Sequence, residues 1–457
     1  MDWVPTISAQ AGPVYRQIAE AIERDIVSGR LRRGQQLPTH RALARALQID
    51  LTTVTRAYAD ASGRGLIEGR VGQGTFVSES SLRPPDLTRD IIDVDLSMNV
   101  PPQPAEAALD SRIAESLAAI ERRTGFSALL NYQRPGGGPA ELEQAARWLA
   151  PRLPGLSIER MTIFPGSQSA IFSVLIFLCR PGDCVLTEAL TFPGFRSAAQ
   201  KLGLTVVGVS MDSEGVVPDA LAKAIRTHRP KAVYLTPTIH NPTTATMTAR
   251  RRADIAAILR RTGVPLIEDD AYGALDPSQD VIATLMPNQT FVTTSLSKCL
   301  TPGLRVSFLT APDTASATGL RGILQSIAHM APPLMVALTM EWLRTGEAET
   351  IISAIRKEAG ARQELAARIL RGHTYSAHAY GHHVWMPLPQ GWSRMEFVAQ
   401  LFRRGLSVVA SDAFAIGVAP QAIRLGLGAA RTREDLASAL TLLSATLRQS
   451  GETSPVV

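Results

Sequence analysis

The sequence predicts a multidomain protein, in which a small helical domain with a β-hairpin precedes a large α/β domain that ends in a smaller α+β part. Residues 1–78 repeat apolar positions with the spacing of amphipathic helices and then turn to short strands punctuated by glycine. From about residue 161 the chain alternates short β-type runs with helical stretches, which is typical of a mostly parallel sheet. Residues 79–93 are rich in Ser, Pro and charge, and we interpret them as a linker to a second domain at 94–457.

The composition is that of an ordinary globular protein. The 457 residues are 45% apolar and 19% charged, which excludes disordered and fibrous classes. The longest apolar run, Ala170–Cys179, is half of the roughly 20 residues that a membrane helix needs, and no signal peptide is visible after Met1. Three cysteines are too few for a disulfide framework, so we expect a cytoplasmic protein without a membrane partner.

Positive charge is concentrated in the N-terminal domain. Residues 1–78 carry ten arginines and seven acidic residues, so their net charge of +3 is half of the chain's +6. A small basic domain favours a polyanionic partner, although a solvated helical surface has the same composition.

Three helices and a hairpin are predicted in this domain. The helices cover residues 14–29, 40–47 and about 51–62. Thr39 can cap the second helix, and Asp50 or Thr52 can cap the third. Leu66-Ile67 and Thr75-Phe76-Val77 are predicted as the two short strands. The order of these elements predicts a helix–turn–helix followed by a β-hairpin wing.

The start of the third helix carries polar side chains suited to DNA. Thr52, Thr53 and Arg56 lie near its first turn. Short hydroxyl side chains and an arginine at this place suit base edges and phosphates in a major groove. A small helical interaction domain is the alternative that the pattern leaves open.

Several segments of this domain resemble the winged-helix domain of the GntR regulators. They run nearly without gaps from residue 13 to 78 and comprise Pro13-Val14-Tyr15-Arg16-Gln17-Ile18, Gly29-Arg30-Leu31, Gly34-Gln35-Gln36-Leu37-Pro38-Thr39-His40-Arg41, Leu43-Ala44, Thr53-Val54, Ala57-Tyr58 and Gly72-Gln73-Gly74-Thr75-Phe76-Val77. The resemblance implies contacts to double-stranded DNA by Arg41, Thr52, Thr53, Gln73 and Gly74. Leu51 stands where the family usually has an arginine, so one contact is expected to be absent or to be made by Arg56 instead.

Seven strands are predicted in the large domain, at Met161–Phe164, Cys184–Thr187, Thr205–Val209, Ala232–Thr236, Leu266–Glu268, Phe291–Thr294 and Val306–Thr310. Helical patterns fit between several of them, for example over Ser167–Cys179 and Ala249–Thr262. Longer helical patterns cover residues 314–371. Residues from about 373 to 448 are predicted as strands and two helices, which form the smaller α+β part.

One of the five lysines has the setting of a chemically active amine. Lys298 follows an apolar strand in Ser295-Leu296-Ser297-Lys298 and precedes Pro302-Gly303-Leu304-Arg305. Burial at a strand end lowers the pKa of a lysine and makes its amine nucleophilic. Two hydroxyls and an arginine close by suit a phosphate, so the pattern indicates a Schiff-base lysine for pyridoxal phosphate. A lysine in an exposed loop is the alternative.

Three further segments place polar groups at the ends of predicted strands. Pro165-Gly166-Ser167-Gln168 begins a helix, and free N–H groups at a helix start bind phosphate. Glu268-Asp269-Asp270-Ala271-Tyr272 offers a carboxylate for a pyridinium proton, and Asn241-Pro242 offers an amide. Open α/β sheets bind ligands at the carboxyl ends of their strands, so these segments together favour a cofactor site.

This order of segments resembles the fold-type I pyridoxal-phosphate aminotransferases over about residues 94–448. The resemblance implies that Lys298 holds the cofactor as a Schiff base and that Asp269 pairs with the pyridine nitrogen. The other cofactor contacts that it implies are Phe192 on the ring, Asn241 and Tyr272 at the phenolic oxygen, and Gly166, Ser167, Gln168, Ser295, Ser297 and Arg305 at the phosphate. Arg424 would clamp a substrate or effector carboxylate. Tyr132 resembles the tyrosine that reaches the neighbouring subunit's phosphate, which implies a homodimer.

A few residues near these motifs are interpreted differently. Ser307 stands two residues after Arg305 where the family usually has a glycine, so that strand is expected to sit slightly differently. His382-His383 is interpreted as a structural pair, because no further ligand is spaced to complete a metal site, and no metal is expected. Cys299 is interpreted as structural, with redox sensing as the alternative.

A winged helix joined to an aminotransferase-like domain resembles the MocR subfamily of the GntR regulators. The resemblance covers nearly the whole chain. It implies a DNA-binding transcriptional regulator that uses pyridoxal phosphate to sense an amine, an amino acid or the cofactor itself. The alternative is a working aminotransferase, which transfers an amino group from an amino acid to a 2-oxo acid, because every residue that transamination needs is present.

Overall fold

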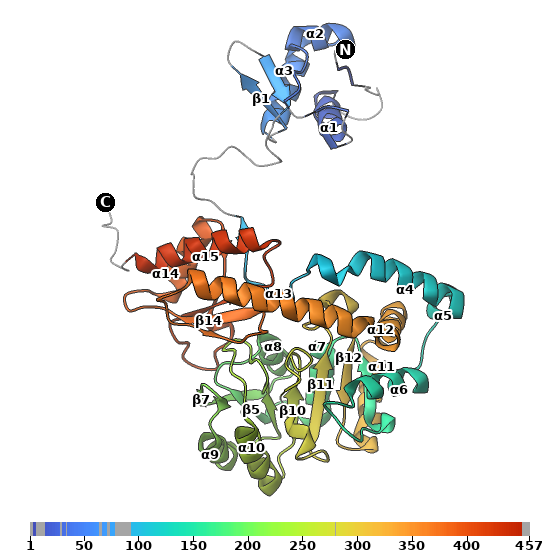
Figure 1. Ribbon diagram of the computed structural model, residues 1–457, viewed down its shortest axis with the longest axis vertical. Helices are drawn as coiled ribbons and strands as arrows, with labels where there is room; N and C mark the ends of the chain where they lie inside the picture. The colour runs from blue at the N-terminus through green and yellow to red at the C-terminus, as the bar shows by residue number, and fades with distance from the viewer. Residues whose placement is uncertain are drawn as a thin grey trace. The chain divides into compact units, whose positions relative to one another are not determined.

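The computed structural model describes residues 3–5, 14–27, 30–32, 34–63, 66–70, 74–77, 93–278 and 280–449. The chain divides into two compact units, Met1–Asp90 and Ile91–Val457 (Figure 1). The predicted linker lies outside the described residues except for Asp93, and so do the predicted helix stop at Gly29 and the wing residue Gln73. No helix in the described part of the chain is long and apolar enough to cross a membrane.

The N-terminal unit is a helix–turn–helix with a wing, as predicted. It contains α1 (Val14–Val27), α2 (His40–Leu47), α3 (Leu51–Gly63), β1 (Ile67–Arg70) and β2 (Gly74–Val77), and the two strands pair antiparallel. The core that joins the helices to the hairpin includes Ile18, Ile22, Leu43, Val54 and Val77.

The helix caps follow from local side chains. The Thr39 hydroxyl accepts the N–H of Ala42 at 3.2 Å, which caps α2 as predicted. Of the two candidates for the cap of α3, Asp50 is the one used, because its carboxylate accepts the N–H of Thr52 at 2.8 Å. The turn between the two helices is made by Gln48, whose φ of 53° lies in the left-handed region.

Seven strands form the central sheet in the order β4-β12-β11-β10-β9-β5-β6. Their bounds are β4 (Met161–Phe164), β5 (Cys184–Glu188), β6 (Thr205–Val209), β9 (Ala232–Leu235), β10 (Leu266–Asp269), β11 (Thr290–Ser295) and β12 (Ser307–Thr310). The sheet is parallel except for β12, which runs antiparallel to both of its neighbours. The prediction of a mostly parallel sheet is therefore confirmed, and Ser307 pairs in register with Phe164 and Ser295.

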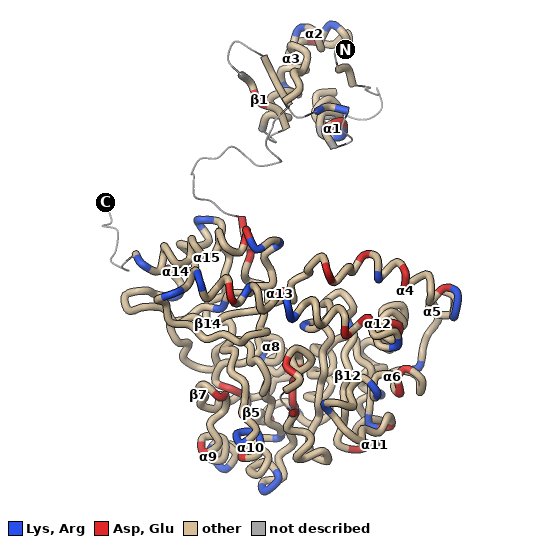
Figure 2. The backbone as a smooth tube through the Cα atoms, viewed as in Figure 1, with Lys and Arg blue, Asp and Glu red and all other residues tan. Residues whose placement is uncertain are grey.

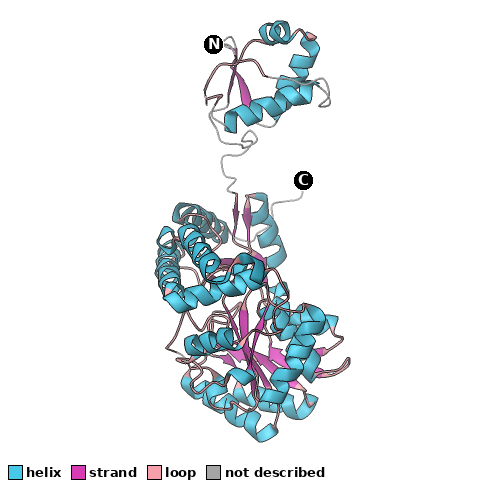
Figure 3. Ribbon diagram, turned by 90° about the vertical axis from the view of Figure 1, so that its right-hand side faces the viewer, coloured by secondary structure: helices cyan, strands magenta, loops and turns pink. Residues whose placement is uncertain are grey.

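Helices enclose the sheet on both faces (Figure 3). One face packs against α7 (Ser167–Leu178), α8 (Pro193–Lys201) and α11 (Thr314–Ile327), and the other against α9 (Pro218–His228) and α10 (Ala249–Thr262). Successive strand residues enter opposite cores. Tyr234, for example, belongs to the first core, while Val233 and Leu235 belong to the second. A short hairpin, β7 (Met211–Asp212) and β8 (Gly215–Val216), precedes α9.

A third group of helices packs beside the sheet. It consists of α4 (Leu109–Thr124), α5 (Phe126–Leu129), α6 (Pro139–Leu149), α12 (Pro333–Thr345) and the long α13 (Glu347–Ile369). Its core includes Trp342 and also Tyr272, Leu296 and Leu300 from the loops that follow the strands. The helices therefore support the loops on which the predicted cofactor residues lie.

The smaller part is an antiparallel sheet covered by helices. The strand order is β13 (Ser376–Ala377), β14 (His383–Pro387), β17 (Ala422–Gly426) and β16 (Val409–Ala410), and the helices are α14 (Arg394–Arg403) and α15 (Arg433–Arg448). The segment β3 (Val94–Asp95) pairs with β15 (Leu406–Ser407). It then passes so close to β17 that the Gly426 N–H donates to the Leu96 carbonyl at 2.7 Å.

Candidate functional site

The predicted cofactor residues meet at one edge of the central sheet. Asp269 ends β10, Ser295 ends β11, and Asn241 lies in the loop that follows β9. Gly166 follows β4, which runs parallel to β11 because β12 is antiparallel to both. All of these strand ends are carboxyl ends, where sheets of this kind bind ligands.

Lys298 is one turn beyond β11, and its amine is buried. Nζ donates a hydrogen bond to the backbone carbonyl of Asn99. Burial and the charges of Arg424 and Arg305 together lower the pKa of Lys298 to about 8, while Asp269 opposes them. At neutral pH a lysine in this state is still mostly protonated, but it supplies far more neutral, nucleophilic amine than an ordinary lysine does. The alternative of a lysine in an exposed loop is therefore wrong.

Asp269 presents one free carboxylate oxygen to the site. Its Oδ2 accepts the hydroxyl of Tyr234 at 2.7 Å, while its Oδ1 is buried and has no hydrogen-bond partner among the described residues. Burial raises the pKa of Asp269 to about 6, and the hydrogen bond from Tyr234 works against this rise. The carboxyl is thus mostly ionised at neutral pH, and Oδ1 suits a ring N–H donor.

Two glycines allow side chains to pack closely around the start of α7. Gly166 has a φ of 87°, and a Cβ on it would lie 2.5 Å from the Arg305 guanidinium. A Cβ on Gly194 would lie 2.1 Å from Gln168 and 2.4 Å from the ring of Phe192. The Arg305 guanidinium therefore lies directly against the start of α7, and a helix start with an arginine beside it suits a phosphate.

Arg424, on β17, is a buried cation without an ion-pair partner among the described residues. It donates to Asn241 Oδ1 at 3.0 Å and to the Ser97 carbonyl, and its Nε is buried with no partner. Burial lowers the pKa of Arg424 to about 10. The planar guanidinium is thus held beside Asn241 with donor capacity left for a ligand carboxylate.

The lysine, the unpaired aspartate oxygen, the glycine-lined anion site and the buried arginine together define a cofactor site of the fold-type I aminotransferase class. The residues fit pyridoxal phosphate, because a buried amine, a carboxylate oxygen without a partner among the described residues and an arginine against Gly166 are the groups that its aldehyde, ring nitrogen and phosphate would require. Phe192 and Gln168 meet at Gly194 on the same edge, where the amide of Gln168 donates to the Gly194 carbonyl at 2.7 Å.

Three residues of this site were not found by motif. Asn99 is 6% exposed and contacts both Lys298 and Tyr272, and nothing in its local sequence distinguishes it from a loop asparagine. His382 lies within 2.7 Å of the Lys298 carbonyl, and His383 lies 3.2 Å from the Asn99 amide. The pair was visible in the sequence, but only its position at the start of β14 shows that it faces the site.

Tyr132 differs from the other predicted residues. Its side chain is 82% exposed, and its ring packs 4.6 Å from that of His329. Leu130 beside it is 85% exposed. A place for Tyr132 at a cofactor therefore stays a prediction that needs a second copy of the chain.

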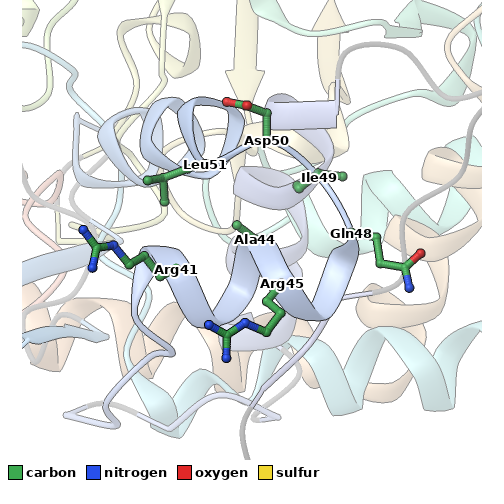
Figure 4. A pocket seen from close by; sticks show the side chains of 7 residues that line it. All are labelled: Arg41, Ala44, Arg45, Gln48, Ile49, Asp50 and Leu51. Carbon is green, nitrogen blue, oxygen red and sulfur yellow. The ribbon is translucent and has the colours of Figure 1, made fainter.

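The helix–turn–helix has a hollow on its surface that is lined in part by basic side chains (Figure 4). Figure 2 shows basic positions of α2 in blue. The hollow has a volume of about 530 Å³, and Arg41 and Arg45 of α2 line it together with Leu51 at the start of α3. Figure 4 shows both arginines extending outward from α2. Because Arg41 and Arg45 are exposed and lie one turn apart, they form the positive side of this face.

The other predicted DNA-binding residues differ in their exposure and in the contacts that their side chains already make. The Thr52 hydroxyl donates to the Asp50 carboxylate at 2.5 Å, so it takes part in the cap of α3. Thr53 is half-buried, and the Arg56 guanidinium stacks 4.1 Å from the ring centre of Tyr15. Gly74, at the described end of the wing, is exposed.

Comparison with known families agrees with this division of the chain. The family of aminotransferases class I and II matches residues 91–443, and the gntR family of bacterial regulatory proteins matches residues 14–77. The chain therefore belongs to the aminotransferase class I and II family, and it carries a GntR-type helix–turn–helix domain at its N-terminus.

Two bacterial transcriptional regulators are similar to this chain over nearly its whole length. The uncharacterized HTH-type transcriptional regulator YdeF of Bacillus subtilis is 28% identical over 446 residues, which cover 97% of this chain and 96% of YdeF. The vitamin B6 salvage pathway transcriptional repressor PtsJ of Salmonella typhimurium is 28% identical over 424 residues, which cover 91% of this chain and 94% of PtsJ. Similarity to these relatives extends through both units and is consistent with the MocR subfamily.

Solved structures resemble the large unit. The alpha-aminoadipate aminotransferase LysN of Thermus thermophilus, complexed with N-(5'-phosphopyridoxyl)-L-leucine, has a TM-score of 0.71 and 25% identity over 79% of this chain and 92% of LysN. The kynurenine aminotransferase of Pyrococcus horikoshii has a TM-score of 0.72 and 22% identity over the same shares. These similarities confirm the fold-type I aminotransferase fold.

Proposed function

We propose that this protein is a transcriptional regulator that binds operator DNA through its GntR-type unit and senses a small amine or amino acid through pyridoxal phosphate in its aminotransferase-like unit. The observation that carries the proposal is the presence, in one chain, of a DNA-binding fold and a site with both a nucleophilic lysine and a buried carboxylate-binding arginine. Its relatives YdeF and PtsJ, which are named as transcriptional regulators, support it.

The cofactor is held by residues whose contacts fit it. Lys298 is the covalent attachment point, Asp269 Oδ1 receives the ring N–H, and Tyr272 and Asn241 serve the phenolic oxygen. The phosphate binds Gly166, Ser167, Gln168, Ser295, Ser297 and Arg305, and Phe192 packs on the ring. When bound, pyridoxal phosphate reacts reversibly with primary amines and thereby makes the site selective for them.

The second recognition element is Arg424. Its unpaired Nε and its position beside Asn241 select an effector with a carboxylate, so the effector class is an amino acid. Binding changes DNA affinity only if the effector prefers one of two conformations of the protein. The exposed Tyr132 and Leu130 support a homodimer, in which Tyr132 reaches the partner subunit's phosphate. The three free cysteines agree with a cytoplasmic setting.

DNA affinity measured with and without amino acids tests this function. DNA from upstream of the protein's own coding sequence serves as the ligand, and mobility shifts give the affinity. The unsubstituted holoprotein should change its affinity in the presence of at least one amino acid. Arg424→Ala should keep basal affinity and cofactor but lose the response to carboxylate-bearing effectors.

Keto-acid release is followed in the same samples. If DNA affinity ignores every amine, amino acid and pyridoxal phosphate while keto acid accumulates at enzymatic rates, the sensor function is wrong and the protein is an aminotransferase.

A further inference from the structure

The side chain of Asn99 lies between the rings of Tyr272 and His383. The hydrogen-bonding state of the His383 ring determines how the Asn99 amide is oriented. Its amide nitrogen is 3.2 Å from His383 Nδ1 and 2.6 Å from the hydroxyl oxygen of Tyr272. The other ring nitrogen of His383, Nε2, is 3.1 Å from the carbonyl oxygen of His240. A carbonyl only accepts hydrogen bonds, so Nε2 of His383 carries the hydrogen.

His383 is therefore an acceptor at Nδ1. The ring is fully buried, and burial holds its pKa well below the usual range, so it is neutral and Nδ1 carries no hydrogen. Only the NH₂ end of the Asn99 amide can face such an atom. The assignment of nitrogen and oxygen in Asn99 thus follows from the partners of His383 rather than from the amide itself.

The second hydrogen of the same NH₂ group goes to Tyr272. The Tyr272 oxygen accepts it, and this leaves the hydrogen of the phenol free to donate elsewhere. The backbone carbonyl of Asn99 meanwhile accepts from Lys298 Nζ, which places the residue beside the amine, while its side-chain Oδ1 is buried with no partner among the described residues. Burial raises the pKa of Tyr272 well above its usual value, so the phenol keeps its hydrogen at neutral pH.

We propose that Asn99 and His383 are positioning residues that direct the phenolic hydrogen of Tyr272 toward the phenolic oxygen of pyridoxal phosphate. The proposal rests on the proposed function only in that the cofactor binds at Lys298. The hydrogen bonds that link His240, His383, Asn99 and Tyr272 orient the phenolic hydrogen of Tyr272. That hydrogen stabilises the ionised form of the cofactor oxygen. The charged and titratable groups that face Tyr272 are Arg424, Asp269, His382 and His383.

The pH midpoint of the visible absorbance band of the bound cofactor measures this hydrogen bond. Tyr272→Phe removes the donor and should raise the midpoint by about one pH unit, because the ionised cofactor oxygen loses a hydrogen bond. Asn99→Asp replaces the NH₂ with an oxygen that accepts the Tyr272 hydrogen, so it should also raise the midpoint. Asn99→Leu removes the donor without adding charge, and a smaller rise is expected.

A double-variant cycle separates positioning from a charge effect. If Asn99 acts through Tyr272, Asn99→Asp should add little to the shift already caused by Tyr272→Phe. His383→Asn, which keeps an acceptor near Nδ1, should leave the midpoint unchanged, while His383→Leu should raise it. The exposed Asn288→Asp is the matched control and should change nothing.

Two results would overturn the inference. Fully additive shifts of Asn99→Asp and Tyr272→Phe would mean that the aspartate acts by its charge alone. An unchanged midpoint in Asn99→Leu and His383→Leu would mean that neither residue orients the phenol. If the unsubstituted protein shows no visible band with pyridoxal phosphate, both this inference and the proposed function are wrong.

Discussion

Three cations and the carboxylate of Asp269 lie in the proposed cofactor site, and their balance explains which ligands it suits. Arg424, Arg305 and Asp269 all act on the charge of Lys298, and burial disfavours the charged forms of Lys298, Arg424 and Asp269. The excess of positive charge remains after these shifts because Arg424, at a pKa of about 10, stays protonated at neutral pH. A site with this balance suits ligands that bring a phosphate and a carboxylate.

Lys298→Ala should abolish covalent attachment of the cofactor, because it removes the one amine at the carboxyl edge of the sheet. Visible absorbance and borohydride trapping measure attachment. Replacement of any of the other four lysines, Lys201, Lys223, Lys231 and Lys357, should leave both signals intact. Trapped cofactor on one of these four would contradict the site.

Glu188 predicts a dependence of stability on pH. It is fully buried, accepts the Thr236 N–H at 2.7 Å, and burial raises its pKa to about 7 from an ordinary value of 4.5. The folded state therefore holds a proton that the unfolded state releases. The stability from this proton is fully present below pH 4.5 and is lost as the pH rises through about 7.

Glu188→Gln should remove this dependence, because the amide does not titrate. The free energy of unfolding of the variant relative to the unsubstituted protein should increase between pH 4.5 and 8, by ~1.4 kcal/mol for each unit of pKa difference. Urea unfolding of the cofactor-free protein at several pH values measures it. Parallel curves for the two proteins would contradict the prediction.

Among the structural elements, the turn from β4 into α7 requires glycine for two separate reasons. Gly166 combines a φ of 87° with a guanidinium in the space that a Cβ would occupy. Gly182, in the turn before β5, has a similar φ of 90° but nothing within 4 Å of such a Cβ. Substitution of the two glycines therefore distinguishes the effect of backbone strain from the effect of close packing at the anion site.

Gly166→Ala should weaken binding of pyridoxal phosphate at least tenfold, because the methyl group displaces Arg305. Gly182→Ala, the matched control, should lower stability by ~1–2 kcal/mol through its backbone alone and leave cofactor affinity unchanged. Fluorescence titration with the cofactor and thermal unfolding measure the two effects. Equal affinity in both variants would mean that Arg305 does not hold the phosphate.

For the protein as a whole, function depends on two units with different chemistry. The N-terminal unit offers exposed arginines to DNA, while the larger unit buries its cations around a ligand site. Because dimer contacts are proposed for the larger unit, the full chain should present two helix–turn–helix units to paired half-sites.

DNA binding should fall steeply as salt rises, because phosphate contacts release counterions. Arg41→Ala should weaken specific binding by ~1–3 kcal/mol if Arg41 contacts a base. Arg261→Ala, at an exposed position of α10 in the larger unit, is the control and should have no effect. Mobility shifts over a salt series measure both. Absence of binding at low salt would favour the enzyme alternative.

Much of the architecture could be predicted because it depends on local patterns. The seven strands of the sheet begin and end within one residue of their predicted bounds, since burial on two helix-covered faces leaves a nearly continuous apolar run. Thr39 caps α2 as expected for the same local reason. Asp50 and Thr52 could not be separated, because both have the chemistry of a cap and only the backbone geometry selects one.

The sequence alone determined the two-part organisation and the order of the motifs along the chain. It also identified Lys298, Asp269 and Arg424 as candidates, because each of these residues lies in a motif only a few residues long. Only the tertiary structure decided what surrounds them. Asn99 meets Tyr272 across 173 positions of the chain and His383 across 284. No periodicity or motif records such a contact, because it arises from the packing of β3, the central sheet and β14 against one another.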